Sequence, residues 1–125
     1  MILVTGGAGF IGSHTCVALA HAGIPFVVLD NLCNSRRSVL ERVERITGAS
    51  VPFIEGDIRD TALLQRVFAE HAVEGVIHFA ALKSVGESVR EPPRYYDNNV
   101  AGAVALQGSM RAANVRTLVF DSFAT

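Results

Sequence analysis

The chain opens with an apolar run that breaks into glycines, and this pattern constrains its fold more than any other feature. Residues 2–4 are apolar and lead into the stretch T-G-G-A-G-F-I-G over 5–12, in which Gly6, Gly9 and Gly12 are spaced by three. The last six residues of this stretch also fit the stricter G-x-G-x-x-G spacing. The pattern is typical of a strand that turns into a helix around a dinucleotide pyrophosphate.

Each glycine of this motif has an expected role. The first allows the tight turn that leaves the strand, the second lets a phosphate approach the backbone, and the third lets the helix pack closely on the sheet. The beginning of the helix then offers N–H groups and a partial positive charge to the phosphates. An isolated glycine motif would mean little, because glycine is common in turns, but here a strand-like run precedes it.

An acidic residue follows at the end of the second expected strand, residues 25–29. Asp30 occupies the position, about twenty residues after the motif, of the carboxylate that accepts hydrogen bonds from the adenine ribose. It favours NAD over NADP, because a 2′-phosphate there would face a like charge. Arg36 and Arg37 lie nearby and could hold a phosphate, although two arginines at the beginning of a helix are more often simply solvated. We therefore expect NAD as the cofactor.

Strand-like and helical patterns alternate along the whole chain. Apolar runs predict strands over 2–4, 25–29, 51–55, 75–79 and 117–120. Helical spacing predicts helices over 11–22 and 38–46, and a longer one from about Pro92 to about Ala113. A further helix is predicted after Asp60, which can cap it; its buried face carries Leu63, Leu64, Val67 and Phe68. Parallel neighbours need helical crossovers, so this alternation predicts an α/β fold with a Rossmann-type doubly wound parallel sheet. We expect residues 1–125 to form one dinucleotide-binding domain.

Composition excludes several classes of partner. The net charge is −1 and the basic residues are scattered, so no electrostatic footprint for nucleic acid or an anionic membrane is visible. The first apolar run is cut by glycines and no stretch approaches the length of a membrane span, so we expect neither a secretory signal nor a membrane segment. A cytoplasmic protein with a small-molecule partner is the resulting expectation.

The cysteines and histidines do not suggest a metal site. Cys16 and Cys33 have no C-x-x-C spacing and are expected to be incidental, reduced thiols. His14 and His21 are seven residues apart, which is not the i, i+4 spacing of a helical metal pair, and His78 lies inside the fourth expected strand.

Together these residues resemble the amino-terminal, NAD-binding part of the UDP-glucose 4-epimerases (UDP-galactose 4-epimerases), a family of extended short-chain dehydrogenase/reductases. The resemblance spans the whole chain. Its most specific stretches are T-G-G-A-G-F-I-G-S-H-T over 5–15, L-D-N-L-C-N-S over 29–35, E-G-D-I-R over 55–59, L-K-S-V-G-E-S over 82–88 and Y-Y-D-N-N over 95–99. The second, fourth and fifth together are the most specific to the epimerases, and residues 31–35 and 82–88 disfavour a sibling nucleotide-sugar dehydratase.

The resemblance implies a set of residues that bind NAD. It places Gly6, Gly9, Gly12, Phe10 and Ile11 at the pyrophosphate, Asp30, Asn31, Asn34 and Ser35 at the adenosine end, Asp57 and Ile58 beside the adenine, Phe79, Ala80, Ala81 and Lys83 at the nicotinamide half, and Asn98 as a further polar contact. Taken alone, Phe10, Ile11 and Phe79 could equally be core residues. Asp57 could merely shape a turn after Gly56, and Lys83 could be solvated.

The resemblance also implies an activity, the reversible epimerisation of a UDP-sugar at C4 by transient hydride transfer to NAD, as in galactose metabolism. The family uses a Tyr-x-x-x-Lys pair as its base, with a Ser or Thr after the fifth strand. Here Tyr95 and Tyr96 are followed four residues later by Asn99 and Val100, and Phe123 stands at the hydroxyl position. Phenylalanine cannot relay a proton.

We therefore predict no catalytic residue in this chain and expect the isolated 125 residues to be inactive. The expected sheet is truncated before the family's remaining strands and substrate domain. A non-catalytic NAD-binding module, or a fragment of another nucleotide-sugar epimerase or dehydratase, is the alternative.

Self-association is a further expectation. An exposed strand edge and exposed apolar patches favour association. The predicted helix over 92–113 resembles one that helps to form the family's dimer interface, which suggests a homodimer through that helix.

Overall fold

A single five-stranded parallel sheet organises the computed structural model, which describes residues 1–32, 36–79 and 101–120. Its strands are β1 (Ile2–Thr5), β2 (Phe26–Asp30), β3 (Phe53–Glu55), β4 (Gly75–His78) and β5 (Thr117–Phe120). The helices of the described residues are α1 (Phe10–His21), α2 (Ser38–Thr47), α3 (Thr61–Glu70) and α6 (Gly102–Ala112). The predicted α/β fold and its alternation of elements are confirmed.

The strand order is β3-β2-β1-β4-β5. From β1 the chain moves outward through β2 and β3, then crosses to the other side of β1 to form β4 and β5. This reversal leaves a switch point between β1 and β4, and open sheets of this kind bind ligands beyond the carboxyl ends of the strands at such a point.

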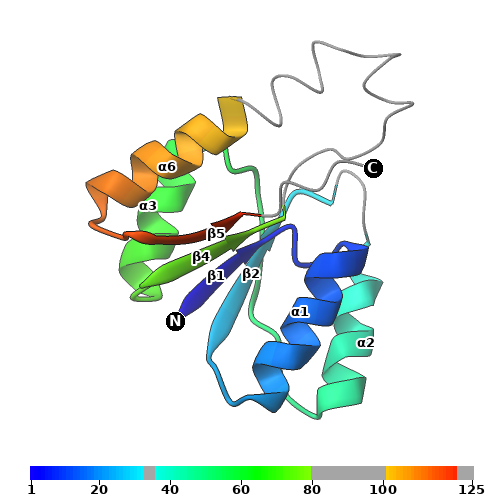
Figure 1. Cartoon of the computed structure of the whole chain (residues 1–125). Coiled ribbons are helices and arrows are strands. Elements are labelled where there is room, and N and C mark those ends of the chain that lie inside the picture. The colour runs from blue at the N-terminus through cyan, green and yellow to red at the C-terminus, as the bar shows by residue number, and fades with distance from the viewer. Residues whose placement is uncertain (33–35, 80–100, 121–125) are drawn as a thin grey trace.

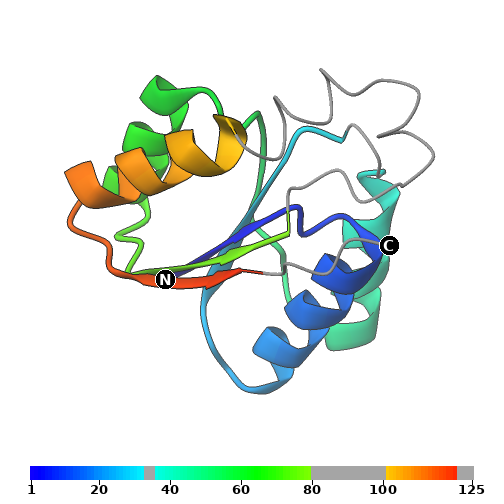
Figure 2. The same ribbon diagram turned by 45° about the horizontal axis from the view of Figure 1, so that its top comes forward.

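Helices cover both faces of the sheet: α1 and α2 lie on one face, and α3 and α6 on the other (Figure 1, Figure 2). Side chains alternate between the two faces along each strand. On β1, Leu3 joins the cluster that includes Leu64 of α3 and Leu106 of α6, whereas Val4 joins the cluster that includes Leu40 of α2. Because both faces are buried, the strands read as nearly continuous apolar runs.

The predicted strand boundaries agree with the structure to within one or two residues. Val51 was expected in the third strand, but the strand begins at Phe53, and the Val51 amide donates to the Glu44 carboxylate at 2.8 Å. Phe79 lies just beyond β4. The start of the predicted helix at Pro92 lies outside the described residues.

Candidate cofactor site

The turn between β1 and α1 is built from the glycine motif. Gly6 has φ +72°, a left-handed conformation that glycine adopts without strain, and its amide donates to the Leu29 carbonyl at 2.8 Å. The Gly9 amide donates to the Gly6 carbonyl at 3.1 Å, and Gly9 caps α1. The turn therefore leaves β1 sharply and stays hydrogen-bonded to the end of β2.

Gly12, the third glycine of the motif, was expected to let the helix pack closely on the sheet, but it packs on the turn instead. A Cβ on Gly12 would overlap the Gly6 carbonyl oxygen and come within 2.9 Å of the Gly7 Cα, so Gly12 lies against the turn itself. The close approach to the sheet falls instead to Gly7, whose Cβ would be 2.7 Å from Cγ1 of Val28 on β2. Helix α1 begins immediately above the turn, and this position leaves no space for a side chain at Gly12.

The first turn of α1 carries no side-chain cap and no acidic residue. The amides of its first residues, Phe10, Ile11 and Gly12, have no partner within an α-helix, because an α-helix leaves its first N–H groups unpaired. Ile11 is 45% exposed, which excludes the core alternative for its side chain. Together with the helix dipole, these amides can bind a phosphate.

Asp30 lies beside this turn at the end of β2. It is buried, with 7% of its surface exposed, and its carboxylate links two backbone segments. Oδ2 accepts from the Ala8 amide at 3.1 Å, and Oδ1 accepts from the Leu32 amide at 2.8 Å. The carboxylate therefore ties the glycine turn to the residue that follows Asn31 after β2.

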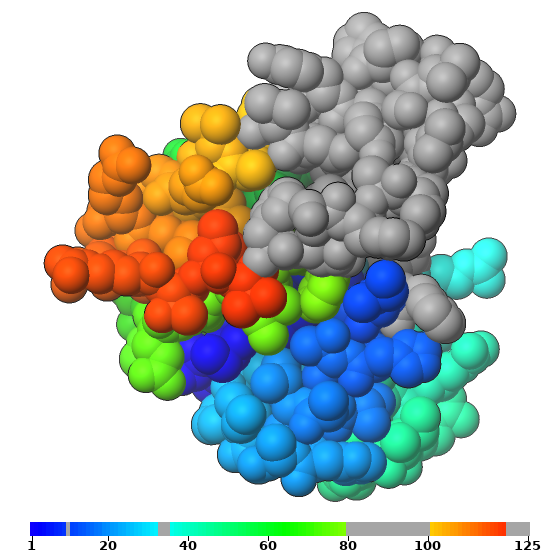
Figure 3. Space-filling view, viewed as in Figure 1, coloured from blue at the N-terminus to red at the C-terminus, as the bar shows by residue number. Residues whose placement is uncertain are grey.

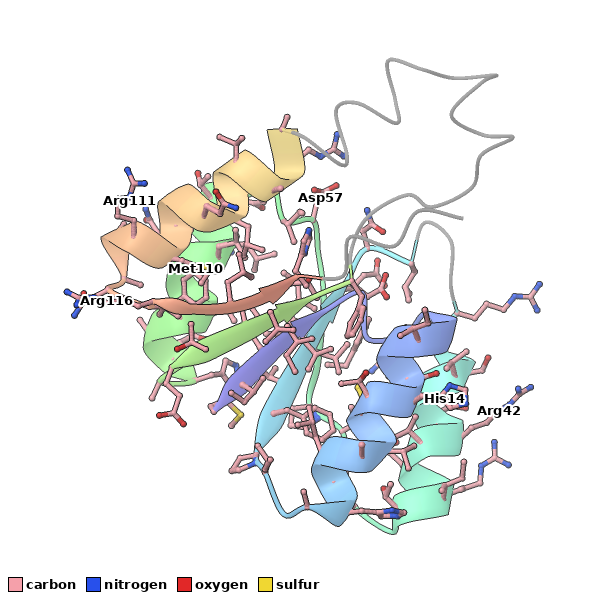
Figure 4. The ribbon with its side chains drawn as sticks, viewed as in Figure 1. His14, Arg42, Asp57, Met110, Arg111 and Arg116 are labelled. Atoms are coloured by element: carbon pink, nitrogen blue, oxygen red, sulfur yellow. The ribbon has the colours of Figure 1, made fainter. Side chains whose placement is uncertain are left out.

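A second carboxylate follows β3, the neighbouring strand. Asp57 accepts from the Arg59 guanidinium and from Asn31, and Figure 4 shows it beyond the carboxyl ends of the strands, near the first turn of α6. The hydrogen bonds from Arg59 lower the pKa of Asp57, so the group is ionised at neutral pH.

Ile58 does not present its side chain to this edge. It is 3% exposed and belongs to the core cluster under α3 and α6, where a Cβ on Gly102 would come within 2.8 Å of its Cδ1. Any contact between Ile58 and a cofactor must therefore come from its backbone.

Thr5 and His78 form a buried polar pair that no sequence motif singles out. They face each other at the ends of β1 and β4, are 0% and 1% exposed, and are joined by a 2.6 Å hydrogen bond between Thr5 Oγ1 and His78 Nδ1. The Phe79 amide donates to the Thr5 carbonyl at 2.7 Å. The signal in the sequence is a polar residue at the end of two apolar runs, but only the strand order makes these two residues neighbours.

The structure thus brings the glycine turn, Asp30, Asn31, Asp57 and Phe79 to one edge of the sheet. The half-buried Phe79 also packs against the core cluster of α1 and α2, so its core alternative holds in part. The other predicted site residues, Asn34, Ser35, Ala80, Ala81, Lys83 and Asn98, lie outside the described residues, as do Tyr95, Tyr96 and Phe123.

Neither a cluster of metal ligands nor a membrane-spanning helix occurs among the described residues. Within 1–32, 36–79 and 101–120, no group of three or more His, Cys, Asp or Glu side chains could hold a metal ion. Over the same ranges, no helix has both the length and the apolar character needed to span a membrane.

The strand order, the glycine turn and the acidic residue that follows β2 define a Rossmann-type α/β protein. The model of the NAD dependent epimerase/dehydratase family matches residues 2–123, and the chain belongs to this family.

Its relatives include UDP-glucose 4-epimerases. The enzyme of Pasteurella multocida is 60% identical over 124 residues, which is 99% of this chain and 37% of that protein. Among solved structures, the chain is similar to the UDP-glucose 4-epimerase of Stenotrophomonas maltophila, which was solved with bound NAD and formylated UDP-arabinopyranose. The TM-score is 0.93 at 53% sequence identity, and the match covers 95% of this chain and 35% of the epimerase chain. The UDP-glucose 4-epimerase of Bifidobacterium longum, in complex with NAD+ and UDP, gives a TM-score of 0.94 at 50% sequence identity. That match covers 97% of this chain and 36% of the epimerase chain. The chain therefore spans little more than a third of the length of these three relatives.

Proposed function

We propose that residues 1–125 form one domain, the NAD-binding part of a UDP-glucose 4-epimerase. The observation that carries the proposal is the position of Asp30, whose buried carboxylate lies beside a glycine turn and a helix start without a side-chain cap. Relatives at 50–53% identity hold NAD or NAD+ in their solved structures, which supports the choice of cofactor.

The described residues fit this cofactor. The amides of Phe10, Ile11 and Gly12 bind the pyrophosphate, and the absence of a side chain at Gly9 leaves the turn accessible. Asp30 accepts hydrogen bonds from the adenine ribose, and its charge disfavours a 2′-phosphate. Bound NAD would take up a hydride from the substrate and return it. The resemblance assigns the remaining contacts to Asn34, Ser35, Ala80, Ala81, Lys83 and Asn98.

The isolated chain is proposed to bind the cofactor without catalysing epimerisation. The sequence contains no Tyr-x-x-x-Lys pair, so a base for the sugar hydroxyl has to come from outside these residues. Binding of a UDP-sugar likewise belongs to the longer relatives, of which the chain spans little more than a third.

A calorimetric titration of NAD into the purified chain tests the proposal, with circular dichroism on the same sample to establish folding. We expect one NAD per chain, weaker binding of NADP, and at least about tenfold weaker binding of NAD by Asp30→Ala, because a hydrogen bond to a charged group is worth ~1.5–3 kcal/mol. The matched control is Glu70→Ala, which removes an exposed carboxylate at the last residue of α3 and should not change the affinity. A folded chain that binds no NAD would contradict the proposal.

Inactivity has its own assay. The purified chain is incubated with NAD and UDP-galactose, and UDP-glucose is measured. We expect none to form; conversion at a rate abolished by Asp30→Ala would show that these residues carry the chemistry themselves.

A further inference from the structure

Arg37 and Phe53 form a contact between α2 and β3. The Cζ atom of Arg37 lies 5.2 Å from the centre of the Phe53 ring, within the range of a cation–π interaction. Among the described residues Arg37 takes part in no ion pair, so the ring is the group against which its guanidinium rests. Phe53 is half-buried and packs against the core cluster of α1 and α2, which fixes the position of the ring.

This contact draws the guanidinium away from the carboxyl edge of the sheet. Phe53 pairs with Val28 of β2. The candidate ribose acceptor, Asp30, pairs with Glu55, two residues further along both strands. Two residues of a strand span about 6.6 Å. The Arg37 side chain therefore lies along the sheet and not over the ends of the strands.

The backbone of Arg37, in contrast, lies at that edge. Arg37 is the N-cap of α2, and its carbonyl accepts from the Leu40 amide at 3.0 Å. Helix α2 begins beside the start of α1, at the carboxyl ends of the strands (Figure 1, Figure 2). Helical side chains tilt toward the N-terminus of their helix, which here faces the candidate site. A guanidinium released from Phe53 can therefore reach the edge at which Asp30 lies.

We propose that Phe53 is a specificity-determining residue, whose ring holds the Arg37 guanidinium along the sheet and so withholds a phosphate-binding cation from the adenine ribose. The inference rests on the proposed NAD function and adds a second cause for the preference over NADP. An arginine binds a phosphate through two parallel hydrogen bonds. A free guanidinium at this edge would therefore offset part of the repulsion between Asp30 and a 2′-phosphate, and the contact with Phe53 prevents this.

The test compares NAD with NADP, which differ only in the 2′-phosphate. Both are titrated calorimetrically into the wild-type chain, Phe53→Leu, Phe53→Tyr and the double variant Phe53→Leu/Arg37→Gln. The matched control is Phe53→Leu/Arg45→Gln, because Arg45 is an exposed arginine in the last turn of the same helix. We expect Phe53→Leu to bind NADP about three- to fivefold more tightly than the wild type, the effect of losing one exposed cation–π contact, with the NAD affinity unchanged.

Phe53→Tyr keeps the aromatic ring and should bind both dinucleotides as the wild type does. The gain in NADP affinity should disappear in Phe53→Leu/Arg37→Gln and persist in Phe53→Leu/Arg45→Gln. An unchanged ratio of the two affinities in Phe53→Leu, NADP binding too weak to measure in that variant, or a gain that survives Arg37→Gln would overturn the inference while leaving the NAD function intact. If Phe53→Leu does not fold, Phe53→Met decides by the same ratio. A folded wild-type chain that binds neither dinucleotide would overturn both proposals.

Discussion

Gly12 and Gly108 are both helical glycines, but their surroundings are opposite. A Cβ on Gly12 would overlap the backbone of the turn, whereas a Cβ on Gly108 of α6 would meet no atom within 4 Å. We expect Gly12→Ala to lower the free energy of unfolding by about 1–3 kcal/mol through overpacking. Gly108→Ala should raise it by about 0.5–1 kcal/mol, because alanine is the better helix former. Urea denaturation measures both, and changes of the same sign would contradict the geometry of the turn.

Cys16 illustrates a buried and therefore inert thiol. It lies against the Gly7 carbonyl, and burial raises its pKa from 9.0 to about 12. The folded chain therefore keeps the proton where the unfolded chain loses it, so this contribution to stability is complete below the unfolded pKa of 9.0 and is lost as the pH rises toward about 12.

Alkylation by iodoacetamide at about pH 9 tests this in a Cys33→Ser variant, which leaves Cys16 as the only thiol. Cys16 should be modified many times more slowly in the native chain than in urea. Equal rates would mean that the thiol is accessible and ionised in the folded state.

For individual residues, the sequence predicts the features that depend on the spacing between residues. It does not predict the contacts that depend on the tertiary structure. The glycine turn and Asp30 follow from the motif and its distance from the second strand. The orientation of Ile58 into the core, the pairing of Thr5 with His78, and the contact of Arg59 with Asp57 depend on side-chain directions that no spacing encodes.

Helix α3 shows how a local signal survives folding. Asp60 was predicted as its cap, and its Oδ1 accepts from the Leu63 amide at 3.1 Å, which confirms the prediction. We expect Asp60→Ala to cost about 1 kcal/mol of unfolding free energy. Glu70→Ala, at the other end of the same helix, should be neutral or slightly stabilising, because it removes a negative charge near the negative end of the helix dipole. Thermal unfolding compares the two, and an Asp60→Ala variant as stable as Glu70→Ala would show that the cap contributes nothing.

The extent of β3 marks the limit of such local signals. The run over 51–55 looks uniform in sequence, but the Val51 amide donates to Glu44 of α2, and the strand begins at Phe53. The Pro52 carbonyl still accepts from the Val28 amide of β2 at 2.9 Å. A side chain of the preceding helix thus takes the Val51 amide, and only the tertiary structure reveals that contact.

The whole sheet followed from the alternation of elements, because parallel strands require crossovers. Strand β5 forms one edge of the sheet, where another copy of the chain could pack. Figure 3 shows α6 and the edge strand β5 side by side at the surface, and they carry Val104 and Val119, which are 64% and 57% exposed.

We predict that the chain self-associates through α6 and β5, as exposed apolar residues next to a strand edge favour. Sedimentation velocity should show a concentration-dependent coefficient, which Val104→Lys combined with Val119→Lys removes. Ile46→Lys on α2, also exposed at 65%, is the control and should change nothing. A concentration-independent monomer of 13.4 kDa would contradict the prediction.

The central claim is that NAD binds at the carboxyl edge of the sheet, over the first turn of α1. Amide chemical shifts of the ¹⁵N-labelled chain, followed during a titration with NAD, test it residue by residue. The amides of Ala8 to Gly12 and of Leu32 should shift saturably, whereas those of Gly23 and Asn114, at the opposite ends of α1 and α6, should not. Shifts confined to the opposite edge, or none at all in a folded chain, would contradict the account.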